Sequence, residues 1–137
     1  MEKNTWFHLG RNSCEEILYC LRRIADPCEE HVDNNFVPLS KEQVKEYIPL
    51  RDTVLFLLRR TGKILQTDSY GEVDDVRREA EELKDCLEKA REAQMQRMQS
   101  SKENITVAYL YLNLLQETRE LTSSLRHLLR ASKGFRE

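Results

Sequence analysis

The pattern of apolar residues is most regular near the C-terminus, in residues 101–132. Side chains suited to burial recur there at spacings of three, four and seven residues, which is the pattern of an amphipathic helix. One stripe comprises Val107, Tyr111, Leu114, Thr118, Leu121, Leu125 and Leu128, and a second stripe beside it comprises Leu112, Leu115, Thr122 and Leu129. Because a surface helix needs only one stripe, two stripes predict a helix of roughly 45 Å that other helices cover from several sides.

The first helix is predicted from about Asn4 to about Asn34, because apolar residues keep helical spacing over this range. Pro27 predicts a kink, since proline removes one helical hydrogen bond and clashes with the preceding turn. The pair Asp26-Pro27 is also a good helix start, so the helical pattern continues past Pro27 in either case. We expect a loop from Asn35 to Leu39 after this helix.

The second helix is predicted to begin after Ser40, which forms a capping box with Gln43 three residues later. Pro49 predicts a bend or brief break near Tyr47, because the residue before a proline disfavours the helical conformation. The helix ends at the turn Asp68-Ser69-Tyr70-Gly71. Gly71 is suited to a left-handed backbone conformation in that turn.

The third helix is predicted over about Glu72 to Gln99, with one thin apolar stripe and dense charge on its other faces. These features indicate a peripheral helix. A short break at Ser100 and Ser101 precedes the last helix, and the end of the chain, residues 132–137, is predicted to fray. The sequence therefore predicts one domain over residues 1–137, an all-α, antiparallel up-and-down four-helix bundle whose last helix is the most buried.

Composition and charge narrow the classes of function. The chain has 137 residues, the size of one domain, and a formal net charge of −2. We expect no nucleic-acid partner, because the chain has no general basic field. Apolar runs stay shorter than the roughly 20 residues that span a bilayer, and the N-terminus lacks the apolar core of a signal peptide. These features predict a soluble polypeptide.

Residue types that carry chemistry are scattered along the chain. The cysteines Cys14, Cys20, Cys28 and Cys86 lack zinc-ligand spacing, which favours buried thiols in a reducing compartment over a redox or metal role. His31 lies on the apolar side of the first helix, where a hydrogen-bonded core histidine is expected. The basic pairs Arg22-Arg23 and Arg59-Arg60 are interpreted as surface residues, with contact to an anion or acidic lipid as the alternative.

Carboxylates spaced four apart are the remaining candidates for metal chemistry, because such pairs on facing helices bind metals in bundle cores. The di-iron type also needs Glu-x-x-His motifs, which this sequence lacks. Most of the acids lie on the third helix among lysines and arginines, which favours a solvated, salt-bridged face. The pairs are Glu29 with Asp33, Asp75 with Glu79, Glu81 with Asp85, and Glu88 with Glu92. We predict no catalytic, cofactor-binding or metal-binding residue.

Two segments resemble a known family. Tyr111 to His127, in which a tyrosine precedes a Leu-Leu pair and then a polar stretch, resembles the last helix of a PhoU-type bundle. The block His31 to Phe36, after a long N-terminal helix, adds to the similarity. Together they resemble the cytoplasmic C-terminal region of bacterial sodium/phosphate cotransporters over most of the chain.

The resemblance also makes a metal site doubtful. PhoU proteins often bind metal clusters through a Glu/Asp-x-x-x-Asp motif on the last helix of a bundle. In this chain the motif falls near Arg119 and Ser123, which are not carboxylates. The similar segment Leu21 to Asp26 keeps Asp26 but has Arg22 at the acidic position. We therefore expect no stoichiometric metal and no cofactor.

The function implied by the resemblance is that of a regulatory or accessory domain of a sodium-dependent phosphate cotransporter, and not of an enzyme. The domain would lie at the cytoplasmic face of the inner membrane, as part of a longer chain. It would contact the transmembrane part of the same transporter through helix faces, and a second copy as a homo-oligomer. Trp6 and Phe7 would cap the core or pack against an upstream unit. The alternative is a free-standing PhoU-type regulator of phosphate uptake or a metal-binding helical bundle.

Overall fold

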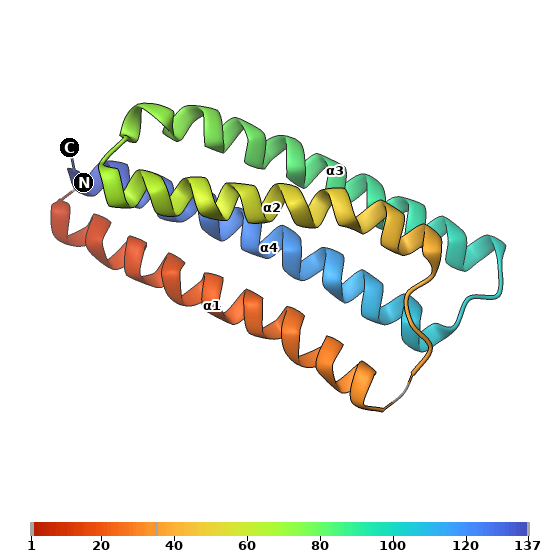
Figure 1. Cartoon of the computed structure of the whole chain (residues 1–137). Coiled ribbons are helices and arrows are strands. Elements are labelled where there is room, and N and C mark those ends of the chain that lie inside the picture. The colour runs from red at the N-terminus through yellow and green to blue at the C-terminus, as the bar shows by residue number, and fades with distance from the viewer. Residues whose placement is uncertain (1, 35, 137) are drawn as a thin grey trace.

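The computed structural model describes residues 2–34 and 36–136. These residues form a helical bundle of four long helices, α1 (Lys3–Asp33), α2 (Lys41–Thr67), α3 (Val73–Ser100) and α4 (Ile105–Arg136). A short 3₁₀ turn, Tyr70–Glu72, precedes α3. Both ends of the chain lie at the same end of the bundle (Figure 1). The prediction of an all-α bundle of four helices is confirmed, while Asn35 of the predicted loop and Glu137 lie outside the described residues.

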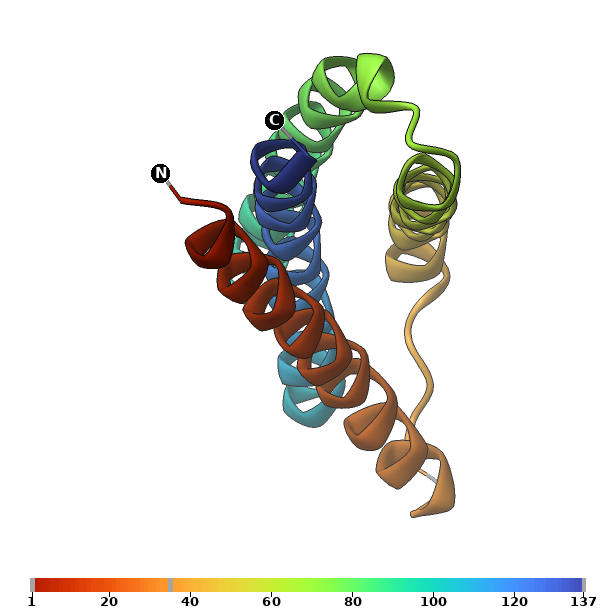
Figure 2. The same ribbon diagram turned by 90° about the vertical axis from the view of Figure 1, so that its left-hand side faces the viewer.

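The last helix is the most buried one, as its two stripes predicted. Thirteen residues of α4 are buried, against three in α1, five in α2 and seven in α3, so the core is built around α4. Each of the other helices contacts α4, and α1 contacts little else. Figure 2 shows the ribbons of α1 and α2 on different sides of α4.

Two buried threonines complete the stripes of α4 without leaving polar groups unpaired. The Thr118 hydroxyl donates a hydrogen bond to the carbonyl of Leu114 at 2.7 Å, and the Thr122 hydroxyl donates to the carbonyl of Thr118 at 2.8 Å. A buried hydroxyl that bonds the preceding turn is satisfied within its own helix. The structure corrects one member of the second stripe, because Ala108 is buried while Leu112 is only half-buried.

The first helix continues through Pro27, as the pattern predicted. Proline has no amide hydrogen, so the carbonyl of Arg23, four residues earlier, loses its helical partner. The side-chain amide of Asn113 on α4 donates to this carbonyl at 3.4 Å. Replacement of the lost hydrogen bond by a neighbouring helix explains why the proline does not end α1.

The second helix begins as predicted but has no break. The Ser40 hydroxyl accepts from the amide of Gln43 at 3.1 Å, and the Gln43 side chain accepts from the amide of Ser40 at 2.9 Å, which confirms the capping box. The prediction near Tyr47 was a bend or a brief break, and the break is wrong, because α2 continues through Pro49 without interruption. Burial of Val54, Leu57 and Ile64 further along the same face holds the helix against the bundle.

The left-handed residue between α2 and α3 is Asp68, with φ of 55°, and not Gly71 as predicted. Aspartate tolerates this conformation better than most residues. The Asp68 amide donates to the carbonyl of Ile64, which closes the last turn of α2. Its carboxylate accepts a hydrogen bond from Arg136 at 2.8 Å, so this turn is tied to the end of α4.

Both predicted ends of the last helix need correction. The helix begins at Ile105 because the Asn104 side chain caps it, accepting from the amide of Val107 at 3.1 Å. The predicted frayed end is helical to Arg136. Packing stabilises this end, since a Cβ atom added to Gly134 would lie 2.3 Å from the Trp6 ring. Trp6 thus covers the end of α4, while the Phe7 side chain is exposed.

The central role of α4 can be tested with Leu121→Ala. The Leu121 side chain is 1% exposed, so truncation should lower the free energy of unfolding by about 2–5 kcal/mol through lost burial and a residual cavity. Leu18→Ala is the matched control, since Leu18 is 67% exposed and its truncation should change the stability by less than about 0.5 kcal/mol. Equal denaturation midpoints for both variants in urea would show that α4 is not the centre of the core.

Candidate functional site

A polar cluster between α2, α3 and α4 is the most connected set of charged groups. The Arg97 guanidinium donates to both Glu46 carboxylate oxygens at 3.1 and 3.2 Å and to Gln94 at 2.7 Å. The Tyr111 hydroxyl donates to Glu46 at 2.6 Å. Burial and this bond to a carboxylate raise the pKa of Tyr111, so the phenol stays protonated. These side chains are hydrogen-bond partners of one another, and the cluster links three helices. This arrangement favours a structural role over ligand binding.

Two of the polar predictions are confirmed. His31 is buried, and its Nε2 lies 2.6 Å from the carbonyl oxygen of Val37, which is the expected core histidine. The acids of α3 form a salt-bridged face: Asp75 pairs with Arg78 at 3.0 Å and Glu88 with Arg91 at 3.2 Å.

The cysteine prediction is only half right. Cys20 is buried and Cys28 is half-buried, but Cys14 and Cys86 are exposed. Burial, with the nearby Glu16 carboxylate, raises the pKa of the Cys20 thiol to about 11. Burial also raises the pKa of Cys28. The wrong prediction for Cys14 has a physical reason, because its face of α1 carries apolar neighbours that no other helix covers.

In each of the two basic pairs, one arginine forms an ion pair and the other does not. Arg23 donates to Glu117 of α4 at 2.8 Å and to Glu16 at 2.9 Å. Arg60 pairs with Glu79 of α3 at 3.1 Å. Arg22 and Arg59 are exposed and, within residues 2–34 and 36–136, take part in no ion pair. One arginine of each pair therefore joins two helices, and the other lies exposed on the surface, as predicted for these residues.

The positions that the PhoU motif would occupy do not converge on a site. Arg119 and Ser123 are half-buried on α4, while Arg22 and Asp26 are exposed on α1. In the described part of the chain, no three residues among His, Cys, Asp and Glu come close enough to hold a metal ion together. None of the described helices is long and apolar enough to cross a membrane.

A hollow of about 500 Å³ between α1 and α4 has a mixed lining that includes Trp6, Glu16, His127 and Arg130. Two of its charged groups have contacts within the fold. Glu16 accepts from Arg23 at 2.9 Å, and the Arg130 guanidinium stacks on the Trp6 ring at 5.9 Å from its centroid. These contacts fix the positions of both side chains.

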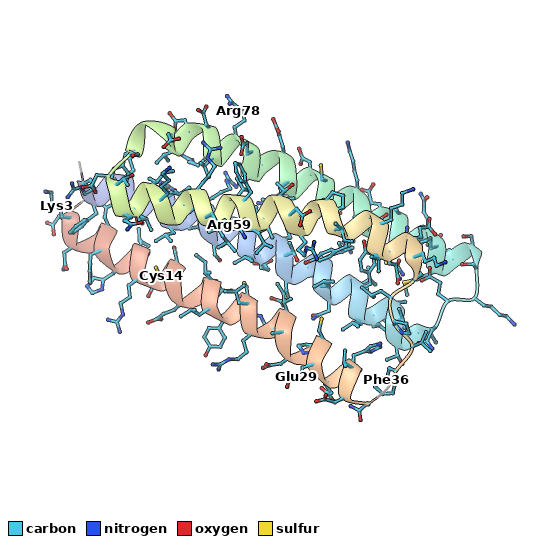
Figure 3. The ribbon with its side chains drawn as sticks, viewed as in Figure 1. Lys3, Cys14, Glu29, Phe36, Arg59 and Arg78 are labelled. Carbon is cyan, nitrogen blue, oxygen red and sulfur yellow. The ribbon has the colours of Figure 1, made fainter. Side chains whose placement is uncertain are left out.

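An apolar groove lies between α1 and α2, with α4 as its floor. We call it the α1–α2 groove. It has a volume of about 300 Å³ and is lined by Cys14, Ile17, Leu18, Leu58, Thr61, Gly62, Leu65, Leu125 and Leu128. A neighbouring hollow of about 330 Å³ shares Cys14, Leu65 and Leu128 with it, which makes the two continuous towards the chain ends. Figure 3 labels Cys14 on α1 and Arg59 on α2, the helices that flank the groove.

The groove exists because α1 and α2 scarcely contact each other. Each of these helices packs one face on the rest of the bundle, and a second apolar face beside it remains uncovered. Large apolar side chains that are 39% exposed or more recur along both helices. They are Leu18, Leu21 and Val32 on α1, and Val44, Ile48 and Leu55 on α2; of these, Leu18 lines the groove itself. Exposed apolar side chains beside an apolar groove make this face a candidate interaction site. Sequence reasoning missed it because it assumed that every apolar stripe is covered within the bundle.

Comparison of the chain with protein-family models, with curated proteins and with solved structures finds no match in any of the three.

The four thiols should differ in reactivity in the folded protein. The thiolate is the reacting species, so at pH 8 exposed Cys14 and Cys86 should react with a disulfide reagent first, and buried Cys20 only after unfolding. Between the ordinary thiol pKa of 9.0 and the folded value of about 11, the unfolded state loses the Cys20 proton before the folded state does. Stability should therefore fall as pH rises through this range.

The measurement is a thiol count against time with mass-spectrometric assignment, at pH 8, with and without denaturant. Cys20→Ser is the control for assignment of the slow thiol. Simultaneous modification of all four thiols in the absence of denaturant would contradict the burial of Cys20.

Proposed function

We propose that this chain is a PhoU-like accessory domain of a sodium-dependent phosphate cotransporter and that it acts by contact through helix faces, without catalysis. In this proposal the bundle has antiparallel up-and-down topology and works at the cytoplasmic face of the membrane. The observation that carries the contact function is the uncovered α1–α2 groove. The transporter assignment is supported by the resemblance of Tyr111–His127 and His31–Phe36 to that family.

The residues that carry the resemblance have structural roles consistent with a bundle of this kind. Tyr111 is fully buried and donates to Glu46, and Leu115 is 1% exposed in the core. His31 binds the carbonyl of Val37 and thereby closes the link after α1. Both ends of the chain lie at one end of the bundle (Figure 1), which supports an even number of reversing helices. Such a domain can be tethered to a membrane unit from one side.

A tethered domain needs little intrinsic affinity for its partner, because the tether supplies a high effective concentration. A groove with a few exposed leucines on its walls is therefore sufficient for regulation by contact. The alternative function is a free-standing PhoU-type regulator or a metal-binding bundle, since a helical bundle could serve either role. Elemental analysis tests the metal-binding alternative, which one or more tightly held transition-metal ions per chain would support.

Removal of the domain from the full reading frame should alter the regulation or the level of phosphate uptake while leaving the transport pathway in place. The measurement is uptake of labelled phosphate in cells with the full transporter and with the domain deleted, under phosphate-rich and phosphate-poor growth. Transporter abundance in the membrane is measured in parallel as the control. Identical uptake rates and identical abundance under both conditions would contradict a regulatory or accessory role.

A further inference from the structure

The hollow between α1 and α4, which we call the α1–α4 hollow, has the dimensions of a small-molecule site. Its volume is about 500 Å³, and such sites in proteins have volumes of roughly 300–1,000 Å³. The space remains because small side chains, Ser13 on α1 and Ser124 and Ala131 on α4, lie where the two helices face each other. The Trp6 ring, which packs against Gly134, forms an apolar wall near the start of α1.

A buried hydroxyl in this lining has no partner. The Ser124 side chain is 4% exposed, and in the described part of the chain it takes part in no hydrogen bond. Ser13 on the opposite helix differs, because its hydroxyl donates to the carbonyl of Leu9 at 2.9 Å. The Ser124 oxygen borders the hollow, unlike the Thr61 oxygen, which protein atoms enclose. Because buried polar groups are rarely left unpaired, the Ser124 hydroxyl is suited to a polar group of a ligand in the hollow.

Three further donors line the hollow without a hydrogen-bond or ion-pair partner among the described residues. They are Asn12 on α1, and His127 and Arg130 on α4. The Arg130 guanidinium stacks on the Trp6 ring, and stacking occupies the face of the group while its in-plane N–H donors stay free. Ser124, His127 and Arg130 follow one another at intervals of three residues, so their side chains project from one side of α4. The hollow therefore holds a row of free donors, with Asn12 on the opposite helix.

The acids near the hollow lie at its end opposite to Trp6. Glu16, which lines the hollow, accepts from Arg23 at 2.9 Å. Arg23 also pairs with Glu117 at 2.8 Å, and neither of these two residues belongs to the lining. Glu120 accepts from a neighbouring glutamine side chain and lies outside the lining as well. Glu16 follows Trp6 by ten residues, which is roughly 15 Å of helix, so the acidic end of the hollow is distant from its Trp6 end.

The charges at the Trp6 end are mainly positive on the two helices that line the hollow. Exposed Glu2 and Lys3 lie one turn before Trp6, and Lys133 follows Arg130 by three residues. The Arg130 guanidinium thus borders an apolar wall and has no acid paired with it in the described structure. A cation with free N–H donors beside an aromatic ring fits a carboxylate or phosphate group that is carried on an apolar body.

We propose that the α1–α4 hollow binds a small organic anion whose carboxylate or phosphate group is held by Arg130 and His127. Arginine forms strong, charge-assisted hydrogen bonds with either group. The apolar part of the ligand lies against Trp6 and Leu9, and the Ser124 hydroxyl is a further donor. This inference goes beyond the proposed contact function and does not rest on it, since the hollow shares no lining residue with the α1–α2 groove.

The probes are phenyl phosphate and phenylacetate, with benzyl alcohol as the uncharged analogue and inorganic phosphate as the anion without an apolar part. Binding to the purified whole chain is measured by titration calorimetry and by the fluorescence of Trp6, the single tryptophan of the chain. At least one of the two aromatic anions should bind at one site per chain and shift the Trp6 emission. It should bind about tenfold more tightly than benzyl alcohol or inorganic phosphate, because each of these lacks either the charged or the apolar contacts.

Substitutions locate the site. Arg130→Gln, at an exposed position, should weaken the binding of the aromatic anion about tenfold through loss of the charge. Arg22→Gln is the matched control and should leave the affinity unchanged, since Arg22 is an exposed arginine of α1 outside the hollow. Ser124→Leu should fill the hollow and abolish binding, with circular dichroism to confirm that the variant folds. The two arginine variants keep the test decisive if Ser124→Leu fails to fold.

The proposal is overturned if neither aromatic anion binds saturably, or if benzyl alcohol or inorganic phosphate binds as tightly as they do. It is also overturned if Arg130→Gln and Arg22→Gln bind the anion with equal affinity, or if a folded Ser124→Leu variant still binds it. None of these measurements involves phosphate uptake, so the hollow and the transporter assignment can fail separately.

Discussion

The structure depends on the burial of both apolar stripes of α4. Tyr111, Leu115, Leu121 and Leu129 are each 1% exposed or less. Full burial of a large apolar side chain contributes about 1.5–3 kcal/mol to the stability of the fold. Every other helix contacts α4, while α1 and α2 scarcely contact each other. α4 therefore acts as the shared partner of the bundle, and the arrangement of the remaining helices follows from which part of its surface each one covers.

The groove follows from the same constraint. Once α1 packs on one side of α4, and α2 and α3 pack on the other, the side of α4 that carries Leu125 and Leu128 forms a floor between α1 and α2. The second apolar stripe of α1 then has no helix to cover it.

Much of the fold could be predicted from the sequence, because helix periodicity and capping are local signals. The capping box at Ser40 and the burial of α4 are examples. The predicted fraying of the C-terminus was wrong because a distant contact overrides local preference: Trp6 packs on the end of α4, which stays helical. The continuation of α1 through Pro27 was predicted, but the Asn113 side chain that replaces its lost hydrogen bond was not. The groove was not predictable from pattern alone. The spacing of apolar residues along a helix face is the same whether a neighbouring helix covers that face or not. Only the placement of α1 relative to α2 shows that the face is uncovered here.

Native-state hydrogen exchange followed by mass spectrometry tests the central role of α4 most directly. Amide hydrogens of a helix that is covered on several sides exchange only when the whole domain unfolds. A helix that packs against one neighbour opens with a smaller free energy, so its amides exchange earlier. The account predicts that amides within residues 111–129 of α4 exchange last, at the rate of global unfolding, and that those of α1 exchange earlier. Exchange of α4 as early as that of α1 would contradict the account.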